Sequence, residues 1–498
     1  MVKILRNNKF KIFAIILISL IIDNLLILNN EIPPAWDQGY HLSNVFKMHN
    51  IIGDSNLNFI NKSEHLLNIT NSYRGPLTYF LSAIFLKIFK NSYHFAYLSN
   101  QLFNIICIIS IYKLAKLFRD ESTGVWACLI FTFSPFIINQ RIDYLIDLSL
   151  TSFSTLSLLF FTKWFICNKK NYLISILSGI SLGLIFLVKP TGIIFFILPL
   201  ITIILKKINN QKELLSSLYE TFLFILSFVL IIFPWFSKHW LTIITSTINA
   251  WNWGINYQEG LDFNSFNSWL FYFKTIPIMF GIVNFSVFLL IFIFEKISSK
   301  NLFEINLKKL KKYNLFFFIY ILNCYLIASL MSTKDIRFIM PVFPLLCIFI
   351  ANFINSKNNK LFKSINKKII LLITIFSTLL VSNDGLIVKN LESNSKNNWP
   401  HYEIMNKLKN SNPYLVTTLA VLPDTKEINT FNLEAEAARQ GGNVAVRQIV
   451  SNKNSYKKDL EYFDWFLVKT QQQGVMTGES KQLLNEYLLK NSSFTIND

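Results

Sequence analysis

The stretch Asn30-Glu-Ile-Pro-Pro-Ala-Trp-Asp-Gln-Gly-Tyr-His-Leu42 follows an apolar run at residues 12–28 and decides how the rest of the chain is interpreted. That run is long enough to span a membrane, and no small-residue cleavage site follows it, so we expect an uncleaved signal anchor. The stretch places a carboxylate, Asp37, just beyond this first hydrophobic helix. Asp37 is therefore either a candidate catalytic group or a helix cap or turn residue after the two prolines.

The composition is typical of an integral membrane protein. Hydrophobic residues make up 52% of the 498 residues and charged residues only 15%, and apolar runs of spanning length recur along the chain. We predict a polytopic α-helical protein with about eleven spans. They lie near residues 12–28, 95–112, 122–139, 148–166, 172–188, 190–205, 219–236, 275–294, 313–331, 337–354 and 368–382.

The net charge of +19 reflects membrane topology rather than nucleic-acid binding. Lys and Arg cluster between the apolar segments, and residues 77–89 form a shorter run interrupted by Lys87. If 77–89 does not cross, every dense basic cluster after it faces the cytoplasm, as the positive-inside rule requires. The first loop (residues 29–94) and the C-terminal region then lie outside. We predict domains at residues 1–382 and 383–498.

The C-terminal region loses the spanning hydrophobicity and alternates short strand and helix patterns. This alternation predicts a small parallel α/β layer. The expected strands are residues 414–422, 444–450 and 464–469, and the expected helices are 432–440 and 456–462. Since it contains no glycine-rich phosphate loop, a binding or lid role is favoured over a second active site.

Several short motifs appear in a fixed order along the membrane region. They are Trp36-Asp37-Gln38-Gly39-Tyr40, Tyr73-Arg74-Gly75-Pro76-Leu77, Arg141-Ile-Asp143-Tyr-Leu-Ile-Asp147, Gly179 through Lys189-Pro190, Pro234-Trp235, and Arg337-Phe-Ile-Met-Pro-Val-Phe-Pro344. Together they resemble the GT-C superfamily of membrane glycosyltransferases, in the family 39-like branch of protein O-mannosyltransferases and lipid A aminoarabinose transferases. The resemblance covers residues 12–380. Gln38 stands where those enzymes carry Glu, and Arg74-Gly75 stands where they carry His-Pro.

The resemblance implies an inverting glycosyltransferase that uses a sugar on a polyprenyl phosphate and acts outside the membrane. It implies Asp37 as the catalytic base, because a carboxylate there can accept a proton from the attacking acceptor. The phosphate leaving group requires cations, which Arg supplies with a planar fork. The predicted substrate-binding residues are Arg74, Arg141, Asp143, Asp147, Lys189, Arg337, Tyr40 and His41.

Each of these residues has a simpler interpretation. The arginines are otherwise structural salt bridges or interfacial anchors, Lys189 a snorkelling lysine, and Asp143 and Asp147 solvated loop residues. Asp23, inside the first span, either lines a groove or sits at the interface. The histidines and cysteines show no metal-ligand spacing, so no structural metal is predicted, while a catalytic divalent cation stays open.

The main alternative function is a polytopic transporter or lipid flippase; a non-catalytic assembly subunit is a third. The chain shows no repeat between halves, and the long first loop and α/β tail favour the enzyme. The expected partners are a polyprenyl-phosphate-linked sugar donor, a lipid, glycan or protein acceptor, and membrane lipids, with no nucleic acid. Enrichment in Lys, Asn and Ile is typical of an AT-rich bacterial genome, which indicates the inner membrane and an undecaprenyl carrier. The sugar and the acceptor are left open.

Overall fold

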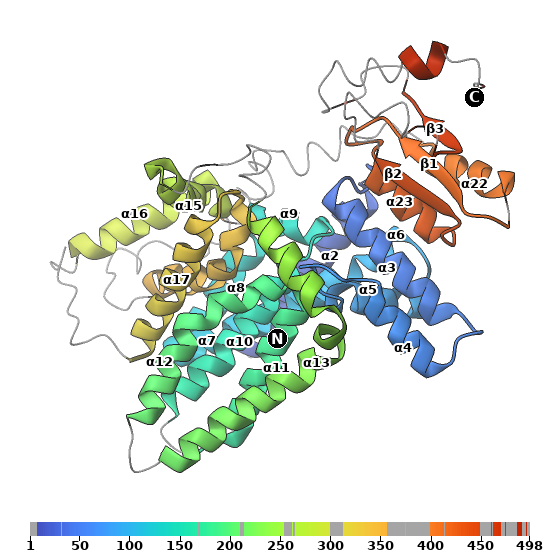
Figure 1. Ribbon diagram of the computed structural model, residues 1–498. Coiled ribbons are helices and arrows are strands. Elements are labelled where there is room, and N and C mark those ends of the chain that lie inside the picture. The colour runs from blue at the N-terminus through green and yellow to red at the C-terminus, as the bar shows by residue number, and fades with distance from the viewer. Residues whose placement is uncertain are drawn as a thin grey trace.

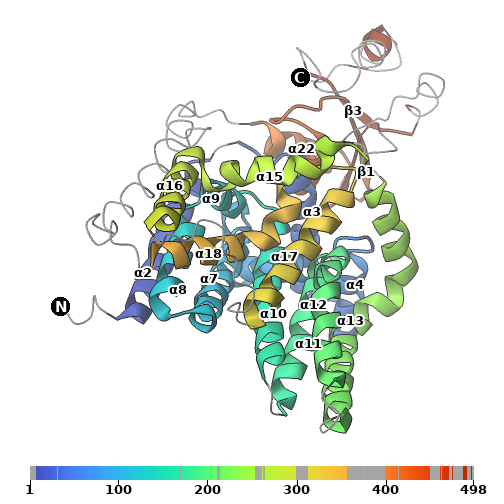
Figure 2. The same ribbon diagram turned by 90° about the vertical axis from the view of Figure 1, so that its left-hand side faces the viewer.

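The protein consists of a large helical body and a small α/β domain at one end (Figure 1). This computed structural model describes residues 7–30, 32–167, 170–209, 214–252, 261, 264–298, 312–355, 374, 399–412, 414–448, 460, 462–469, 474, 486–490 and 495. Long helices run side by side through the body, and their far ends point away from the α/β domain (Figure 2).

Among the described residues, five helices are long and apolar enough to cross a membrane, or up to seven if each of two bent pairs is one span. The bent pairs are α8 (Glu121–Thr132) with α9 (Pro135–Ile142), and α15 (Phe266–Phe280) with α16 (Ile282–Ser298). The five are α2 (Asn8–Leu28), α6 (Tyr93–Ala96) with α7 (Leu98–Phe118), η1 (Pro190–Phe196) with α12 (Ile197–Ile208), α13 (Leu214–Trp251), and η4 (Ile336–Val342) with α18 (Phe343–Ile354).

This count differs from the eleven spans predicted. Two of the predicted spans, α11 (Tyr172–Val188) and α17 (Lys312–Leu330), have apolar stretches too short for this count, at residues 172–188 and 314–330. Helix α5 (Leu77–Ile88) is also short and apolar, and it was predicted not to cross. The predicted span at 368–382 falls outside the described residues apart from Thr374. The predicted span at 275–294 is not one straight helix, because it bends by 101° at Gly281. Gly281 has φ +81°, a left-handed conformation that ends α15.

Helix α10 (Asp147–Ile166) is the polar centre of the helical body. Most of its residues are buried, including the hydroxyl-bearing Ser152, Thr155 and Thr162. These three hydroxyls donate to backbone carbonyls four residues earlier, so they are satisfied within the helix. Because other helices surround it, α10 does not need the apolar surface that lipid contact requires, and it brings Asp147 to the end nearest the α/β domain.

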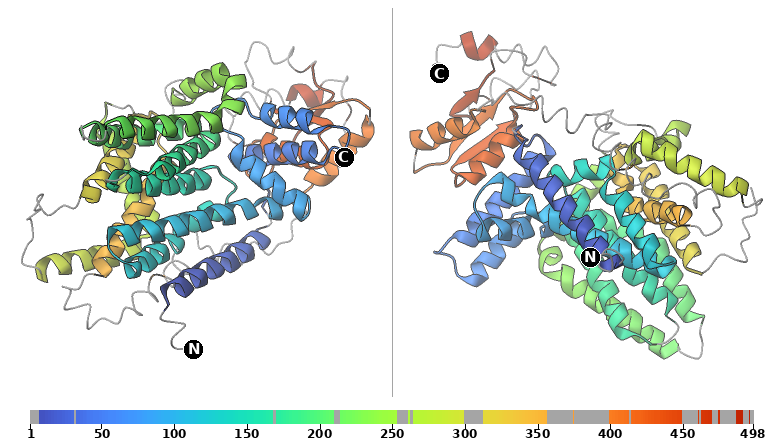
Figure 3. Two further views of the ribbon diagram at one scale, coloured as in Figure 1. Left: turned by 90° about the horizontal axis from the view of Figure 1, so that it is seen from below. Right: turned by 180° about the vertical axis from the view of Figure 1, so that it is seen from behind.

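The first loop folds into α3 (Asp37–Gly53) and α4 (Phe59–Asn68), and α5 packs against α3. Figure 3 shows α2 running along the helical body, with its N-terminal end away from the α/β domain. The first loop and the C-terminal domain therefore lie at the same end of the body, as the topology argument expects.

The C-terminal domain contains a three-stranded parallel sheet in the order β2-β1-β3, which confirms the predicted strand alternation. Its elements are α22 (His401–Ser411), β1 (Thr417–Val421), α23 (Thr430–Arg439), β2 (Val444–Gln448) and β3 (Trp465–Leu467). The predicted boundary at residue 382 and most of the helix predicted at 456–462 lie outside the described residues.

Helix α23 packs directly on α3. The Lys47 Nζ atom lies 2.6 Å from Glu434 Oε1, and Asn50 Nδ2 donates to the carbonyl of Ala438 at 2.8 Å. The backbones approach so closely at Gly39 that an added Cβ would lie 2.6 Å from the carbonyl carbon of Phe431. The C-terminal domain therefore rests on the helix that begins with Asp37.

Candidate active site

Asp37 is the first residue of α3, where the positive end of the helix dipole favours a carboxylate. The N-cap position belongs to Trp36 rather than to Asp37. The Asp37 side chain is 46% exposed, and its Oδ1 accepts a hydrogen bond from Arg74 Nη2 at 3.0 Å. Asp37 therefore presents a partly open carboxylate at the end of the body that faces the C-terminal domain.

Arg74 reaches Asp37 because the segment before α5 presses against the end of α11. The Gly75 N–H donates to the carbonyl of Val188 at 2.9 Å, and a Cβ on Gly75 would lie only 2.1 Å from the carbonyl oxygen of Leu187. Only glycine permits this approach. The Arg74 guanidinium also lies 4.5 Å from the centre of the Tyr40 ring, a cation–π contact that helps to orient it.

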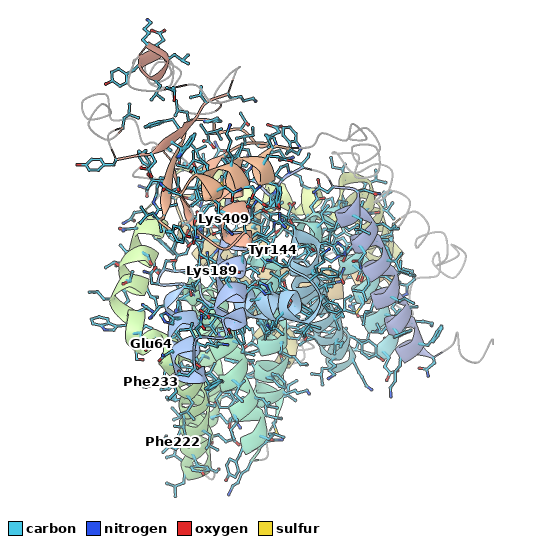
Figure 4. The ribbon with its side chains drawn as sticks, turned by 90° about the vertical axis from the view of Figure 1, so that its right-hand side faces the viewer. Glu64, Tyr144, Lys189, Phe222, Phe233 and Lys409 are labelled. Carbon is cyan, nitrogen blue, oxygen red and sulfur yellow. The ribbon has the colours of Figure 1, made fainter. Side chains whose placement is uncertain are left out.

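Lys189 ends α11 and joins the same group. Its Nζ atom lies 3.5 Å from Asp147 Oδ1 and 5.3 Å from the centre of the Phe338 ring. The side chains of Lys189 and Asp147 are 16% and 8% exposed, so Lys189 is held inside the protein rather than extended along the membrane surface. Figure 4 shows Lys189 and Tyr144 near the C-terminal domain, far from Phe222 on α13.

Arg337 links the three carboxylates of the site. Its Nη1 atom lies 3.7 Å from both Asp37 Oδ2 and Asp147 Oδ2, and its Nη2 atom lies 2.6 Å from Asp335 Oδ2. Burial acts to raise the pKa of Asp335, but hydrogen bonds from Arg337 outweigh it and hold that pKa below its usual value. Arg337 is thus fixed by Asp335 and directed toward Asp37.

The charged cluster combines three cations with three carboxylates. Arg74, Lys189 and Arg337 come from three distant parts of the chain and are 25% exposed or less, while Asp37 is the most exposed carboxylate of the group. Partly buried cations form stronger contacts with phosphate oxygens than cations in open water. The arrangement can therefore hold an anionic leaving group beside a partly exposed carboxylate that two arginines orient.

Tyr40 contacts the charged cluster through Arg74, and His41 is buried next to Tyr40. His41 is 3% exposed, and its Nδ1 atom lies 2.7 Å from the hydroxyl of Tyr79. Burial and the nearby charges of Arg74 and Lys189 hold the pKa of His41 well below its usual value, so its ring is neutral. The structure thus places His41 inside the protein, while Tyr40 lies under Arg74.

Gln38 and Asp143 form a second pair beside Asp37. Gln38 Nε2 donates to Asp143 Oδ1 at 3.0 Å, and Gln38 Oε1 accepts from the Tyr97 hydroxyl at 3.4 Å and the Tyr144 N–H at 3.3 Å. Burial raises the pKa of Asp143 above its usual value. The glutamine at this motif position therefore ties the start of α3 to the loop after α9.

Arg141 pairs with Asp23 rather than with a carboxylate of the charged cluster. Its side chain is 1% exposed, and its Nε atom donates to both carboxylate oxygens of the fully buried Asp23 at 2.8 and 2.9 Å. Its Nη1 atom donates to the carbonyl of Thr132. This geometry is the structural salt bridge that sequence analysis left open, and it also gives Asp23 its partner.

Sequence analysis did not select Asp335, Trp36 or Asp424. The position of Asp335 two residues before Arg337 was a usable signal, but nothing in the sequence links Trp36 with Asp424, whose Oδ1 accepts from the Trp36 indole at 2.9 Å. In the part of the chain that the structure describes, no group of three His, Cys, Asp or Glu residues is arranged to hold a metal.

Residues 73–237 match the family described as dolichyl-phosphate-mannose-protein mannosyltransferase. Comparison with curated protein sequences finds no match. The matched range 73–237 includes Arg74, Asp147 and Lys189 of the charged cluster.

Solved structures share this fold at low sequence identity. ArnT from Cupriavidus metallidurans bound to undecaprenyl phosphate matches with a TM-score of 0.61 and 10% identity, covering 91% of this chain and 89% of that chain. Its apo state matches with a TM-score of 0.58 and 12% identity, over 91% and 88%. The Archaeoglobus fulgidus oligosaccharyltransferase matches at 0.50 and 11%, over 88% and 64%. These matches show that the chain shares the GT-C fold, as the predicted resemblance implies, while the number of spans stays a prediction.

Proposed function

We propose that this protein transfers a sugar from a polyprenyl-phosphate donor to an acceptor, with inversion, on the extracytoplasmic face of a bacterial inner membrane. The observation that carries the proposal is the meeting of Arg74, Lys189 and Arg337 around the partly exposed Asp37. The match to the mannosyltransferase family and the likeness to an undecaprenyl-phosphate-bound ArnT support the same reaction class.

In the proposed reaction, an acceptor oxygen or nitrogen attacks the anomeric carbon of the donor. The new bond forms as the bond between that carbon and the phosphate oxygen breaks, and the polyprenyl phosphate leaves with the electron pair. Asp37 accepts the acceptor proton. Arg74, Lys189 and Arg337 stabilise the charge that grows on the phosphate. A single displacement from the face opposite the phosphate predicts inversion.

In this proposal the other predicted site residues position the charged groups or stabilise the fold. Asp147 positions Lys189 and Arg337, and Tyr40 positions Arg74. Asp143 holds Gln38, and His41 packs behind the site as a neutral ring. Arg141 stabilises the fold through Asp23 rather than binding donor.

The test is transfer from defined polyprenyl-phosphate sugars to candidate acceptors by the purified protein, with the anomeric configuration of the product read by NMR. Asp37→Asn keeps the side-chain size but removes the base, and should lower the rate about 100-fold to 10,000-fold while donor binding survives. Near-normal turnover of Asp37→Asn would move the base elsewhere. Movement of intact donor across vesicles without transfer would support the flippase alternative instead.

A further inference from the structure

A cavity of about 770 Å³ lies where the C-terminal domain meets the outer end of α2. Ile27 and Leu28 at the end of α2, together with Ile32, form an apolar part of its wall. The opposite wall comes from the start of α22 and from α23. The cavity therefore lies between the end of the predicted span α2 and the C-terminal domain.

The lining of this cavity combines aromatic rings with carboxylates. Tyr93, Tyr97, Trp399 and Tyr402 contribute the rings, and Glu403 and Glu436 the carboxylates. Tyr93 is held in place, because its hydroxyl donates to Glu436 Oε2 at 3.1 Å. Aromatic faces pack against the C–H faces of sugar rings. The Glu436 oxygens already accept from Tyr93 and Arg439, so the exposed Glu403 is the carboxylate that can accept hydrogen bonds from sugar hydroxyls.

The charge of the lining disfavours an anionic ligand. No lysine or arginine is among the described residues that line the cavity, whereas two carboxylates are. Glu436 is itself paired with Arg439, whose Nη2 atom lies 2.6 Å from Glu436 Oε1. The described lining thus supplies no cation of its own to hold a phosphate, and it differs in this from the charged cluster proposed for the donor. The walls come from helices and loops, with no open strand edge for an extended peptide to pair with.

Two imidazole nitrogens in the lining lack partners. His94 Nδ1 and His401 Nε2 are buried and accept or donate no hydrogen bond within the part of the chain that the structure describes. Burial holds the pKa of His401 below its usual value, so its ring is neutral. Buried polar atoms are rarely left unsatisfied, and a ligand hydroxyl can both donate to and accept from a neutral imidazole.

The cavity also adjoins the proposed base. Tyr97 lines it, and the Tyr97 hydroxyl contacts Gln38, the residue next to Asp37. The contacts of Gln38 are with Asp143, Tyr97 and Tyr144 rather than with the three cations of the charged cluster. Tyr97 and Gln38 thus connect the cavity to the start of α3, and neither belongs to the charged cluster proposed to bind the donor phosphate.

From these observations we propose that the cavity binds the carbohydrate part of a membrane-anchored glycan acceptor, so that the enzyme extends a glycolipid. This inference rests on the proposed function and names its acceptor class. The apolar wall at the end of α2 receives the lipid-proximal part of the acceptor, and the aromatic and carboxylate wall receives its sugar.

Binding and transfer are measured separately on the full-length protein in nanodiscs. The probes are the octyl glycosides of glucose and N-acetylglucosamine, with a lipidated serine peptide for comparison. Saturation-transfer NMR without donor reports glycoside binding, and a polyprenyl-phosphate sugar then reports transfer. Trp399→Ala and Glu403→Gln should each weaken glycoside binding about tenfold, with donor dependence unchanged. Tyr414→Ala, at a 97% exposed tyrosine of the same domain, is the matched control and should change neither.

The outcomes separate the two proposals. Glycoside binding that is lost in Trp399→Ala and Glu403→Gln but kept in Tyr414→Ala supports the cavity, even if no sugar is transferred and the proposed function fails. Transfer to the serine peptide alone, with no glycoside binding, overturns the cavity proposal and leaves the proposed function standing. Glycoside binding that is equal in wild type and both cavity variants also overturns it. Glu403 is exposed, so Glu403→Gln should fold normally. It therefore tests the cavity even if Trp399→Ala misfolds.

Discussion

Removing the Asp424 carboxylate should slow the reaction at Asp37 without unfolding the protein. Trp36 has φ 46° and ψ −117°, the only positive φ at a non-glycine residue in the described ranges, and it immediately precedes Asp37. Such a conformation costs about 1–3 kcal/mol and persists only when its surroundings hold it. The bond from the Trp36 indole to Asp424 Oδ1, 2.9 Å long, is one such restraint, and the packing of Gly39 on Phe431 is another.

The size of the effect follows from this geometry. A hydrogen bond to a charged group contributes about 1.5–3 kcal/mol, and the 42% exposure of Trp36 lets water replace part of it. A remaining loss of about 1–2 kcal/mol in the positioning of Asp37 corresponds to a fivefold to thirtyfold fall in turnover. The assay is kcat at saturating donor and acceptor for Asp424→Ala.

Two further variants decide whether the bond itself is responsible. Asp424→Asn keeps an Oδ1 acceptor and should recover most of the lost turnover, whereas a merely structural role would not depend on that atom. Trp36→Phe removes the donor, and combining it with Asp424→Ala should add little further loss. Unchanged kcat in Asp424→Ala, or an Asn variant as slow as the Ala variant, would refute the reasoning.

Three other perturbations test the remaining parts of the site. Arg337→Lys keeps the charge but loses the planar fork, so donor use should weaken, and it should weaken more in Arg337→Ala. Unchanged donor dependence in both Arg337→Ala and Lys189→Ala would disprove the phosphate site. Gly75→Ala forces a Cβ into the α11 backbone and should cost about 1–3 kcal/mol of stability, seen as a lower melting temperature in detergent, whereas Gly53→Ala meets no atom within 4 Å and is the control. A single cysteine at Ser55 should react with impermeant reagents in intact cells, and protection there would reverse the predicted topology.

Much of the site could be predicted from the sequence, because its residues sit in short local motifs at the ends of apolar runs. Asp37, Arg74, Lys189 and Arg337 were each selected from such a motif, and the structure brings all four together. The positive-inside rule predicts that all four lie on one side of the membrane.

The eleven predicted spans include residues 148–166, which a test of length and hydropathy leaves out because it treats each helix as though lipid surrounded it. Helix α10 is enclosed by other helices and tolerates many hydroxyl side chains, so it is absent from the five apolar helices although it lies at the centre of the body. The bend at Gly281 depends on a left-handed φ, and glycine permits that conformation without requiring it.

Apolar run length, charge clusters and strand alternation each express a local free energy of transfer or conformation, so they indicate a polytopic membrane protein with a small α/β domain without any tertiary contact. Which charges meet depends instead on how distant segments pack. Arg141 and Asp23 are 118 residues apart and pair in the interior, while Arg337 joins Asp37 instead. Two arginines of the same chemistry thus acquire different roles because a buried charge must find a partner within reach, and reach is set by how the helices pack.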